Sequence, residues 1–230
     1  RQMCIRDRRY TTESPIKAYQ QRYHLALWVT GHRVEGNWAH PDEESSFFEL
    51  KAYVENVLRR VGLQAGQVVT EVSDNNIFDK GLRMKTRGGK VLVDMGIVNH
   101  HVLRRFDIEQ PVYYAEIDWT ELMKATRKNC LLFQELSKYP AVSRDLALLV
   151  DANVEFAQIE QIARQTEKKL LKQVVLFDVY QRKNLPQGKK SYAVNFILQD
   201  ESRTLTDKAI EAIMQKLMKN LTTKLHAELR

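Results

Sequence analysis

The stretch from Tyr180 to Asn195 contains the residue types that bind an unpaired nucleotide. An aromatic ring stacks on a nucleobase, an amide hydrogen-bonds to the edge of the base, and arginine or lysine contacts the phosphate. Because all three types occur here, we predict an RNA-binding surface made of Tyr180, Arg182, Lys189, Lys190 and Asn195. The alternative interpretations are an ordinary surface tyrosine and a solvated hairpin loop.

Part of this stretch, Gln187-Gly188-Lys189-Lys190-Ser191, has the Gly-Lys order of a phosphate-binding loop. That motif needs a second glycine five residues before the Gly-Lys pair, where Lys183 stands. It also needs a helix to follow, so that the helix N-terminus faces the phosphate, whereas a strand is expected here. The sequence therefore argues against nucleotide binding. It leaves two interpretations of the loop, a solvated hairpin and a contact to an RNA backbone.

The remaining candidate residues carry weaker signals. Arg144 is a sixth candidate for RNA contact, although an ion pair fixing the domain entry is the favoured interpretation of Arg144 and Asp145. The histidines have no carboxylate or cysteine at ligand spacing, and Cys130 has no nearby base. We therefore predict no metal site and no catalytic residue in this chain.

The composition suits a chain with hydrophobic cores and no membrane span. Its 230 residues are 43% hydrophobic, which fits one or two domains. No window approaches the roughly 18 uninterrupted apolar residues of a membrane span, and no apolar segment follows the charged start, as it would in a secretory signal. Cys4 and Cys130 are too far apart for a zinc motif or a disulfide framework. We expect a soluble cytoplasmic protein without a membrane partner.

The first nine residues differ from the rest. Gln2-Met3-Cys4-Ile5-Arg6-Asp7-Arg8 resembles the translation of a transposase adapter used in sequencing libraries, so we expect residues 1–9 to be a non-native leader. A native basic arm is the alternative. The net charge is +7, and residues 138–230 hold 16 Lys and Arg against 11 Asp and Glu. This excess permits a polyanionic partner without establishing one.

Residues 10–136 have the pattern of a mixed α+β module. Strands are expected at residues 24–34, 68–72, 82–85, 91–98 and 112–117, and helices at 47–61, 101–106 and 119–125. The strand at 24–34 has apolar residues on both sides of its alternation, so we expect it to be covered on both faces. Because strands and helices do not alternate strictly, we expect an antiparallel sheet with helices on one face.

Residues 137–230 follow a β-α-β-β-α-β order. Strands are expected at 146–150, 174–180, 191–198 and 227–230, and helices at 155–170 and 207–222. This is the ferredoxin-like arrangement. It puts two helices on one face of a four-stranded sheet and leaves the other face available.

The two-residue period of a strand assigns side chains to these two faces. In the strand at 191–198, the residues expected under the helices are Tyr192, Val194, Phe196 and Leu198, and those on the available face are Ala193, Asn195 and Ile197. In the strand at 174–180, the inward residues are Val175, Phe177 and Val179, and the outward ones are Asp178 and Tyr180. A slip of one residue would reverse either assignment.

Five short blocks of residues 137–230 occur in the order of a known family. They are Lys138-Tyr139-Pro140 with Arg144-Asp145-Leu146, Leu176-Phe177-Asp178-Val179-Tyr180, Leu185-Pro186 with Gly188-Lys189-Lys190-Ser191, Arg203-Thr204-Leu205-Thr206, and Ala227-Glu228-Leu229-Arg230. Through these blocks the tail resembles the ferredoxin-fold anticodon-binding domain of bacterial phenylalanine–tRNA ligase β subunits.

The upstream residues resemble the catalytic-like module of the same subunit, which is similar in fold to class II synthetase cores. The matching blocks are Trp28-Val29-Thr30-Gly31, Phe48-Glu49-Leu50-Lys51, and Phe106-Asp107-Ile108 followed by Val112-Tyr113-Tyr114-Ala115-Glu116-Ile117. Class II catalysis needs an arginine that holds the ATP phosphate and a glycine-rich strand that ends in Glu-Arg. Here Ile117 follows Glu116, no glycine run precedes it, and Arg33 has no partner. The module is therefore expected to be a scaffold.

The resemblance implies an α2β2 enzyme that attaches phenylalanine to its tRNA, with ATP and magnesium bound by the catalytic α subunit. This chain would be a C-terminal fragment of the β subunit, roughly its last quarter, that binds the tRNA anticodon region and scaffolds the α subunit. It would itself bind no cofactor. The expected parts are the leader at 1–9, the class II-like module at 10–136 and the anticodon-binding domain at 137–230.

Two other functions remain open. An ACT-type regulatory module that binds amino acids shares the β-α-β-β-α-β order, but such modules often have a glycine between the first strand and helix, and Asp151-Ala152-Asn153-Val154 has none. A free-standing RNA-binding domain is the third option, and the length of the upstream half argues against it.

Overall fold

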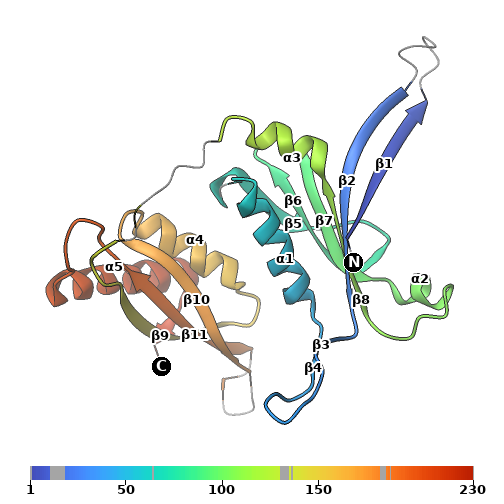
Figure 1. Cartoon of the computed structure of the whole chain (residues 1–230). Coiled ribbons are helices and arrows are strands. Elements are labelled where there is room, and N and C mark those ends of the chain that lie inside the picture. The colour runs from blue at the N-terminus through green and yellow to red at the C-terminus, as the bar shows by residue number, and fades with distance from the viewer. Residues whose placement is uncertain are drawn as a thin grey trace. The chain divides into compact units, whose positions relative to one another are not determined.

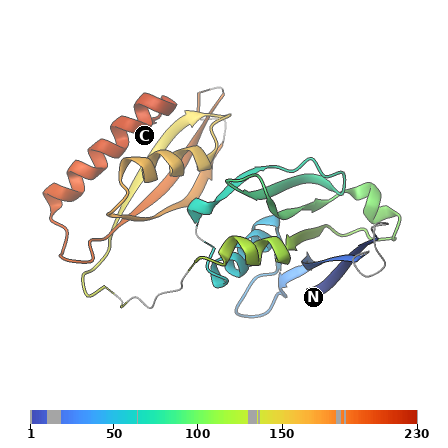
Figure 2. The same cartoon turned by 90° about the horizontal axis from the view of Figure 1, so that it is seen from above.

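The protein divides into two compact units, seen from two directions in Figures 1 and 2. The structure is a computed structural model that describes residues 2–10, 19–63, 65–129, 135, 137–181, 185–186 and 188–229. Unit 1 is Arg1–Leu132 and unit 2 is Phe133–Arg230. Each unit has its own hydrophobic core.

Unit 1 is built on a six-stranded antiparallel sheet with the order β1-β2-β8-β7-β6-β5. Its strands are β1 (Gln2–Tyr10), β2 (Tyr19–Thr30), β5 (Val68–Val72), β6 (Phe78–Thr86), β7 (Val91–Val98) and β8 (Val112–Asp118). A separate two-stranded ribbon consists of β3 (His32–Val34) and β4 (Glu43–Glu44). The expected strand at 24–34 is thus two strands, because Gly31 has a φ of +78° and turns the chain between them.

The helices of unit 1 are α1 (Phe47–Arg60), α2 (His100–Arg104) and α3 (Trp119–Thr126), with a 3₁₀ turn η1 at Ala65–Gln67. Helix α1 begins where the Ser46 side chain accepts a hydrogen bond from the Glu49 N–H, which satisfies one of the free donors of the first turn. It ends before Gly62, whose φ is +85°. The helix expected at residues 47–61 is confirmed.

Both faces of the unit 1 sheet are covered. On one face, Leu27 of β2 packs in a core with Leu50 of α1 and Leu122 of α3. On the other face, Ala26 of β2 packs in a smaller core with Leu103 of α2. The expected two-sided burial of β2 is confirmed, and α2 adds a short helix to the face that was expected to carry none.

Unit 2 has the expected β-α-β-β-α-β order. Its elements are β9 (Val142–Asp151), α4 (Phe156–Thr166), β10 (Leu171–Tyr180), β11 (Lys189–Leu198), α5 (Asp207–Leu225) and β12 (Glu228–Leu229). The sheet order is β10-β11-β9-β12, and its neighbouring strands are antiparallel. Figure 1 shows α4 and α5 side by side on this sheet, and both contribute to a core with β9, β10 and β11.

The predicted faces are right for β11 and partly wrong for β10. Tyr192, Val194, Phe196 and Leu198 of β11 are all buried in the core. On β10, however, Val174 is buried while Val175 pairs with Asn195 on the other face. The reason is a register shift between Leu176 and Asp178, where an extra residue reverses the alternation. Phe177 lies at that shift and is 59% exposed.

Residues 2–9, from the segment that the sequence pattern sets apart, form most of β1, and β1 pairs along its whole length with β2. Their origin outside the native gene stays a prediction. None of the helices in the described part of the chain combines the length and the apolar composition that a membrane span requires.

Candidate nucleic-acid interface

The unit 2 sheet has one face packed under α4 and α5. We call its opposite face the open face. The register of the strands places on it Ser143, Asp145, Ala147 and Leu149 of β9, Val175, Asp178 and Tyr180 of β10, and Ser191, Ala193, Asn195 and Ile197 of β11. Cross-strand neighbours in antiparallel strands point to the same side, so these residues form rows across the face.

One end of the open face carries Tyr180 and Lys189. Tyr180 lies directly opposite Ser191, and Lys189 begins the same strand two residues earlier. The Lys189 Nζ donates to Glu228 Oε1 at 2.5 Å. This hydrogen bond raises the pKa of Lys189. Tyr180, with its aromatic ring, and Lys189, with its cation, therefore lie at one end of a polar sheet face, as the sequence predicts.

The middle of the open face carries Asn195. Its Nδ2 donates to the Ser143 hydroxyl and to Asp145 Oδ1 on β9. Asn195 was expected on this face, and the register confirms that placement. Its two partners could not be foreseen, because about fifty residues separate them from Asn195 and the pairing register is fixed only by the folded sheet.

Two other predicted residues lie on the helix side. Lys190 pairs with the buried Val150, and its Nζ lies 4.9 Å from the centre of the Tyr192 ring in the core. Arg144 pairs with the buried Phe196, and its Nη2 is 4.0 Å from Asp207 Oδ1 at the start of α5. The structure therefore does not bring the predicted residues into one cluster. The physical reason is that neighbouring residues of a strand point to opposite faces.

The favoured interpretation of Arg144 and Asp145 also changes. They do not pair with each other. Arg144 reaches Asp207 on the helix side, whereas Asp145 accepts a hydrogen bond from Asn195 on the open face. The remaining predicted residue, Arg182, lies outside the described residues, as do residues 183, 184 and 187 of the same loop.

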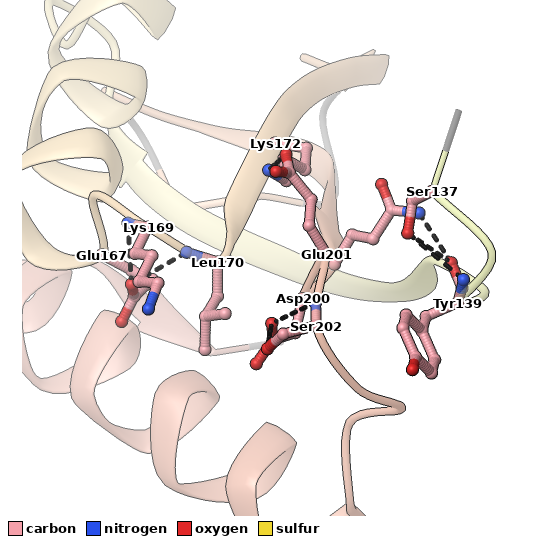
Figure 3. Close-up of polar contacts among 10 residues, drawn as sticks. Ser137, Tyr139, Glu167, Lys169, Leu170, Lys172, Asp200, Glu201 and Ser202 are labelled. Atoms are coloured by element: carbon pink, nitrogen blue, oxygen red, sulfur yellow. Dashed lines mark hydrogen bonds and ion pairs between the residues drawn. The ribbon is translucent and has the colours of Figure 1, made fainter. Parts of the chain in front are cut away.

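The chain enters unit 2 through a group of local hydrogen bonds, drawn in Figure 3. Tyr139 donates its N–H to the Ser137 hydroxyl at 3.2 Å, and its carbonyl accepts from Gln199 Nε2 at 2.7 Å. At the same end of the sheet, Asp200 Oδ1 accepts from the Ser202 hydroxyl and N–H, which lowers the pKa of Asp200. Lys172 pairs with Glu201 at 2.6 Å. These contacts fix the strand ends that position the open face.

In unit 1, two charged contacts involve residues near the expected class II-like strands. On the β3–β4 ribbon, Arg33 pairs with Glu43 at 3.1 Å, so the expectation that Arg33 has no partner is wrong. Between β2 and β8, His24 Nδ1 lies 2.9 Å from Glu116 Oε1. Within the described ranges, no three His, Cys, Asp or Glu side chains come close enough to hold a metal ion.

A ferredoxin-like sheet with two helices on one side and an open polar face, preceded by an antiparallel α+β module, defines a two-part protein of the class that includes RNA-binding domains. Residues 137–230 match the family model of the ferredoxin-fold anticodon binding domain. Residues 7–119 match that of the phenylalanyl tRNA synthetase beta chain CLM domain. The chain belongs to the phenylalanine–tRNA ligase beta subunit family.

Curated relatives named phenylalanine–tRNA ligase beta subunit align with almost the whole chain. The phenylalanine–tRNA ligase beta subunit of Bacteroides thetaiotaomicron is 56% identical over 95% of the chain, and that of Porphyromonas gingivalis is 50% identical over 96%. The subunit of Syntrophotalea carbinolica is 35% identical over 91%. The chain spans 27%, 27% and 26% of the length of these three relatives.

Proposed function

We propose that unit 2 binds the anticodon region of phenylalanine tRNA on its open face, while unit 1 holds the catalytic α subunit of the ligase. The observation that carries the first part is the open face itself. It presents Tyr180, Lys189 and Asn195 on one side of a sheet whose other side is closed by helices. This is the arrangement in which sheet-based proteins stack and hydrogen-bond unpaired bases.

The rows of the open face suggest separate tasks for its residues. The Tyr180 ring offers a stacking platform for one base, and the buried Ser191 lies opposite it on β11. Lys189 offers a positive charge for the phosphate backbone at the same end. Asp178, which the register places on this face beside Ala193, is a further acceptor that the sequence pattern alone did not single out for binding.

The second part of the proposal concerns the whole enzyme. Unit 1 matches a domain of the ligase beta chain, and its sheet is covered on both sides by its own cores. We assign catalysis, ATP and magnesium to the α subunit of an α2β2 assembly, and assign a scaffolding role to unit 1. Co-purification of the 230-residue chain with the α subunit tests this role. Loss of the complex when unit 1 is removed supports it, and retention of the complex by unit 2 alone contradicts it.

The RNA-binding proposal is tested with the full chain and a phenylalanine tRNA transcript at two salt concentrations. Tyr180→Ala should weaken binding roughly tenfold, because stacking on one base contributes about 1–3 kcal/mol, and should leave the salt dependence unchanged. Lys189→Ala should weaken binding and lower the slope of log K against log salt by about 1. Lys190→Ala, on the helix side, should change the slope less.

Two control variants make the test specific. Tyr53→Ala removes an exposed tyrosine from α1 of unit 1, and Lys216→Ala removes an exposed lysine from α5. Both should bind the transcript as tightly as the wild type. The proposal fails if the chain does not distinguish this tRNA from a polyanion of the same length, or if Tyr180→Ala binds as tightly as Tyr53→Ala.

A further inference from the structure

The open face carries a second polar group, distinct from the end that holds Tyr180. Asn195 of β11 donates hydrogen bonds from Nδ2 to the Ser143 hydroxyl and to Asp145 Oδ1 of β9. A primary amide has two N–H donors, and both are used here. The Asn195 amide is thereby fixed in orientation, and it fixes the Asp145 carboxylate in turn.

Asp145 keeps unused capacity as an acceptor. An ionised carboxylate can accept about four hydrogen bonds, and in the part of the chain that the structure describes Asp145 accepts one, from a neutral amide, and takes part in no ion pair. Its neighbour Arg144 points to the helix side. The carboxylate is exposed, so water satisfies it in the free protein and a ligand with N–H donors can replace that water.

The Asp145–Asn195 group lies too far from Tyr180 for one base to contact both. Ser191, opposite Tyr180, and Asn195 lie four residues apart on β11, which is about 14 Å at 3.4 Å per residue. The row between them has Ala193 of β11 next to Ala147 of β9. These small apolar side chains form a low floor on which a planar base can lie. A base at Asp145 therefore belongs to a different nucleotide from the base at Tyr180.

An acidic side chain is unfavourable near phosphates, since like charges repel. An aspartate on a face that binds RNA is useful only where it meets hydrogen-bond donors on the edge of a base, as Asp and Glu do when they accept from the amino group of cytosine. Adenine, cytosine and guanine present an exocyclic amino group. Uracil presents two carbonyl oxygens on either side of its single N–H, and these would face the carboxylate.

We propose that Asp145, positioned by Asn195 and Ser143, is a base-reading site that accepts a hydrogen bond from the exocyclic amino group of a second unpaired nucleotide and rejects uridine there. The site rests on the proposed function, because it presumes that the open face binds the tRNA. Asp145 makes the contact, and Asn195 is a positioning residue.

The test is Asp145→Asn in the full 230-residue chain, titrated against the phenylalanine tRNA transcript. The substituted amide keeps an oxygen for Asn195 but turns the other acceptor into a donor. We expect about tenfold weaker binding, which lies within the range for loss of one good base contact. The sign is diagnostic, because removing a negative charge strengthens binding to a polyanion if only long-range electrostatics act. Glu211→Gln, on the exposed side of α5, removes the same charge and should bind as tightly as the wild type or slightly tighter.

A nucleotide scan identifies the base. Each amino-bearing nucleotide of the anticodon loop is replaced by uridine in turn, and each transcript is titrated with wild type and with Asp145→Asn. One replacement, at a nucleotide other than the one sensitive to Tyr180→Ala, should cost the wild type about tenfold and Asp145→Asn less than twofold. Asn195→Ala should lose about threefold at the same nucleotide. This measurement stands if Asp145→Asn proves unstable by circular dichroism, because a structural defect would weaken all transcripts equally.

The outcomes separate the two proposals. If Tyr180→Ala weakens binding while Asp145→Asn binds as tightly as Glu211→Gln, the Asp145 site is wrong and the proposed function stands. If Asp145→Asn or Asn195→Ala weakens every transcript by the same factor, the site is equally wrong. If neither Tyr180→Ala nor Asp145→Asn changes binding, the open face is not the tRNA-binding surface and both proposals fall.

Discussion

The pKa of the Tyr114 hydroxyl is raised by its surroundings in unit 1. The residue is 8% exposed, and its ring stacks on that of Trp28 with 4.1 Å between centroids. Burial raises the pKa of Tyr114 to about 12, and the negative charge of Glu116 and a hydrogen bond to Glu116 act in the same direction. The phenol therefore stays protonated in folded unit 1 at a pH where it ionises in the unfolded chain.

This shift gives unit 1 a pH dependence of known sign. Because the folded pKa lies above the unfolded value, the contribution is complete below pH 10 and is lost as the pH rises from 10 to 12. At pH 11 the loss of this contribution lowers the free energy of unfolding by about 1.4 kcal/mol. Tyr114→Phe should therefore lose less stability than the wild type between pH 9 and pH 11, by about that amount.

Denaturant unfolding followed by tryptophan fluorescence measures this, since Trp28, Trp38 and Trp119 all lie in unit 1. Tyr139→Phe, in unit 2, should not alter the fluorescence transition at either pH. Equal losses for Tyr114→Phe and wild type would show that Tyr114 ionises at the same pH in both states.

At the scale of the residue, the sequence shows which side chains have the chemistry to bind RNA, but it predicts only in part the face of the sheet to which each side chain points. The sequence shows the side chains suited to RNA around Lys189. However, Lys189 and Lys190 are the same residue type and lie on opposite faces of the sheet. The Asp145–Asn195 contact was invisible, because about fifty residues separate its partners and hydrogen bonding across strands depends on register.

At the scale of the element, β7 depends on a glycine for its close contact with β6. A Cβ built on Gly96 would lie 2.5 Å from Cγ of Phe78 and 2.6 Å from the carbonyl oxygen of Lys80. The ring is buried and the oxygen belongs to the backbone, so neither can move freely. We expect Gly96→Ala to lower the free energy of unfolding of unit 1 by about 3 kcal/mol, at the upper end of the cost of overpacking.

The matched control is Gly88→Ala in the turn between β6 and β7, where the nearest atom to an added Cβ is the Thr86 Oγ1 at 3.8 Å. This variant should stay within about 0.5 kcal/mol of the wild type. Fluorescence-monitored unfolding of the two variants decides the matter. Similar unfolding midpoints for Gly96→Ala and Gly88→Ala would mean that β6 can shift away from β7 to admit a methyl group without lowering the free energy of unfolding.

The elements themselves were largely predictable, because their signals are local. Helices α1 and α5 begin where the sequence predicts, at Phe47 and Asp207, because each follows a capping residue, Ser46 or Thr206, whose side chain accepts from the N–H three positions later. The exchange of faces on β10 was not predictable. A bulge adds one residue without any change in composition, and only the pairing of Leu176 with Val194 and of Asp178 with Ala193 reveals it.

At the scale of the whole molecule, the two units have separate cores. The core of unit 2 contains residues from Leu148 onwards, and both cores of unit 1 end at or before Leu122. The change from a mixed α+β pattern in residues 10–136 to a β-α-β-β-α-β order in residues 137–230 predicted two parts, because the spacing of apolar residues is a local feature. The faces that each unit presents depend on the pairing of distant strands, and the sequence predicted them only in part.

Separate cores predict separate unfolding. Leu217 of α5 is fully buried in the unit 2 core, and Leu122 of α3 is fully buried in the unit 1 core. Replacing either leucine by alanine should destabilise its own unit by about 2–5 kcal/mol, because a cavity remains. Leu217→Ala should shift part of the far-ultraviolet circular dichroism transition to lower denaturant and leave the tryptophan fluorescence transition in place, since all three tryptophans are in unit 1. Leu122→Ala should shift the fluorescence transition. If Leu217→Ala moves the fluorescence midpoint as far as Leu122→Ala does, the units unfold as one cooperative body and unit 2 cannot be studied apart from unit 1.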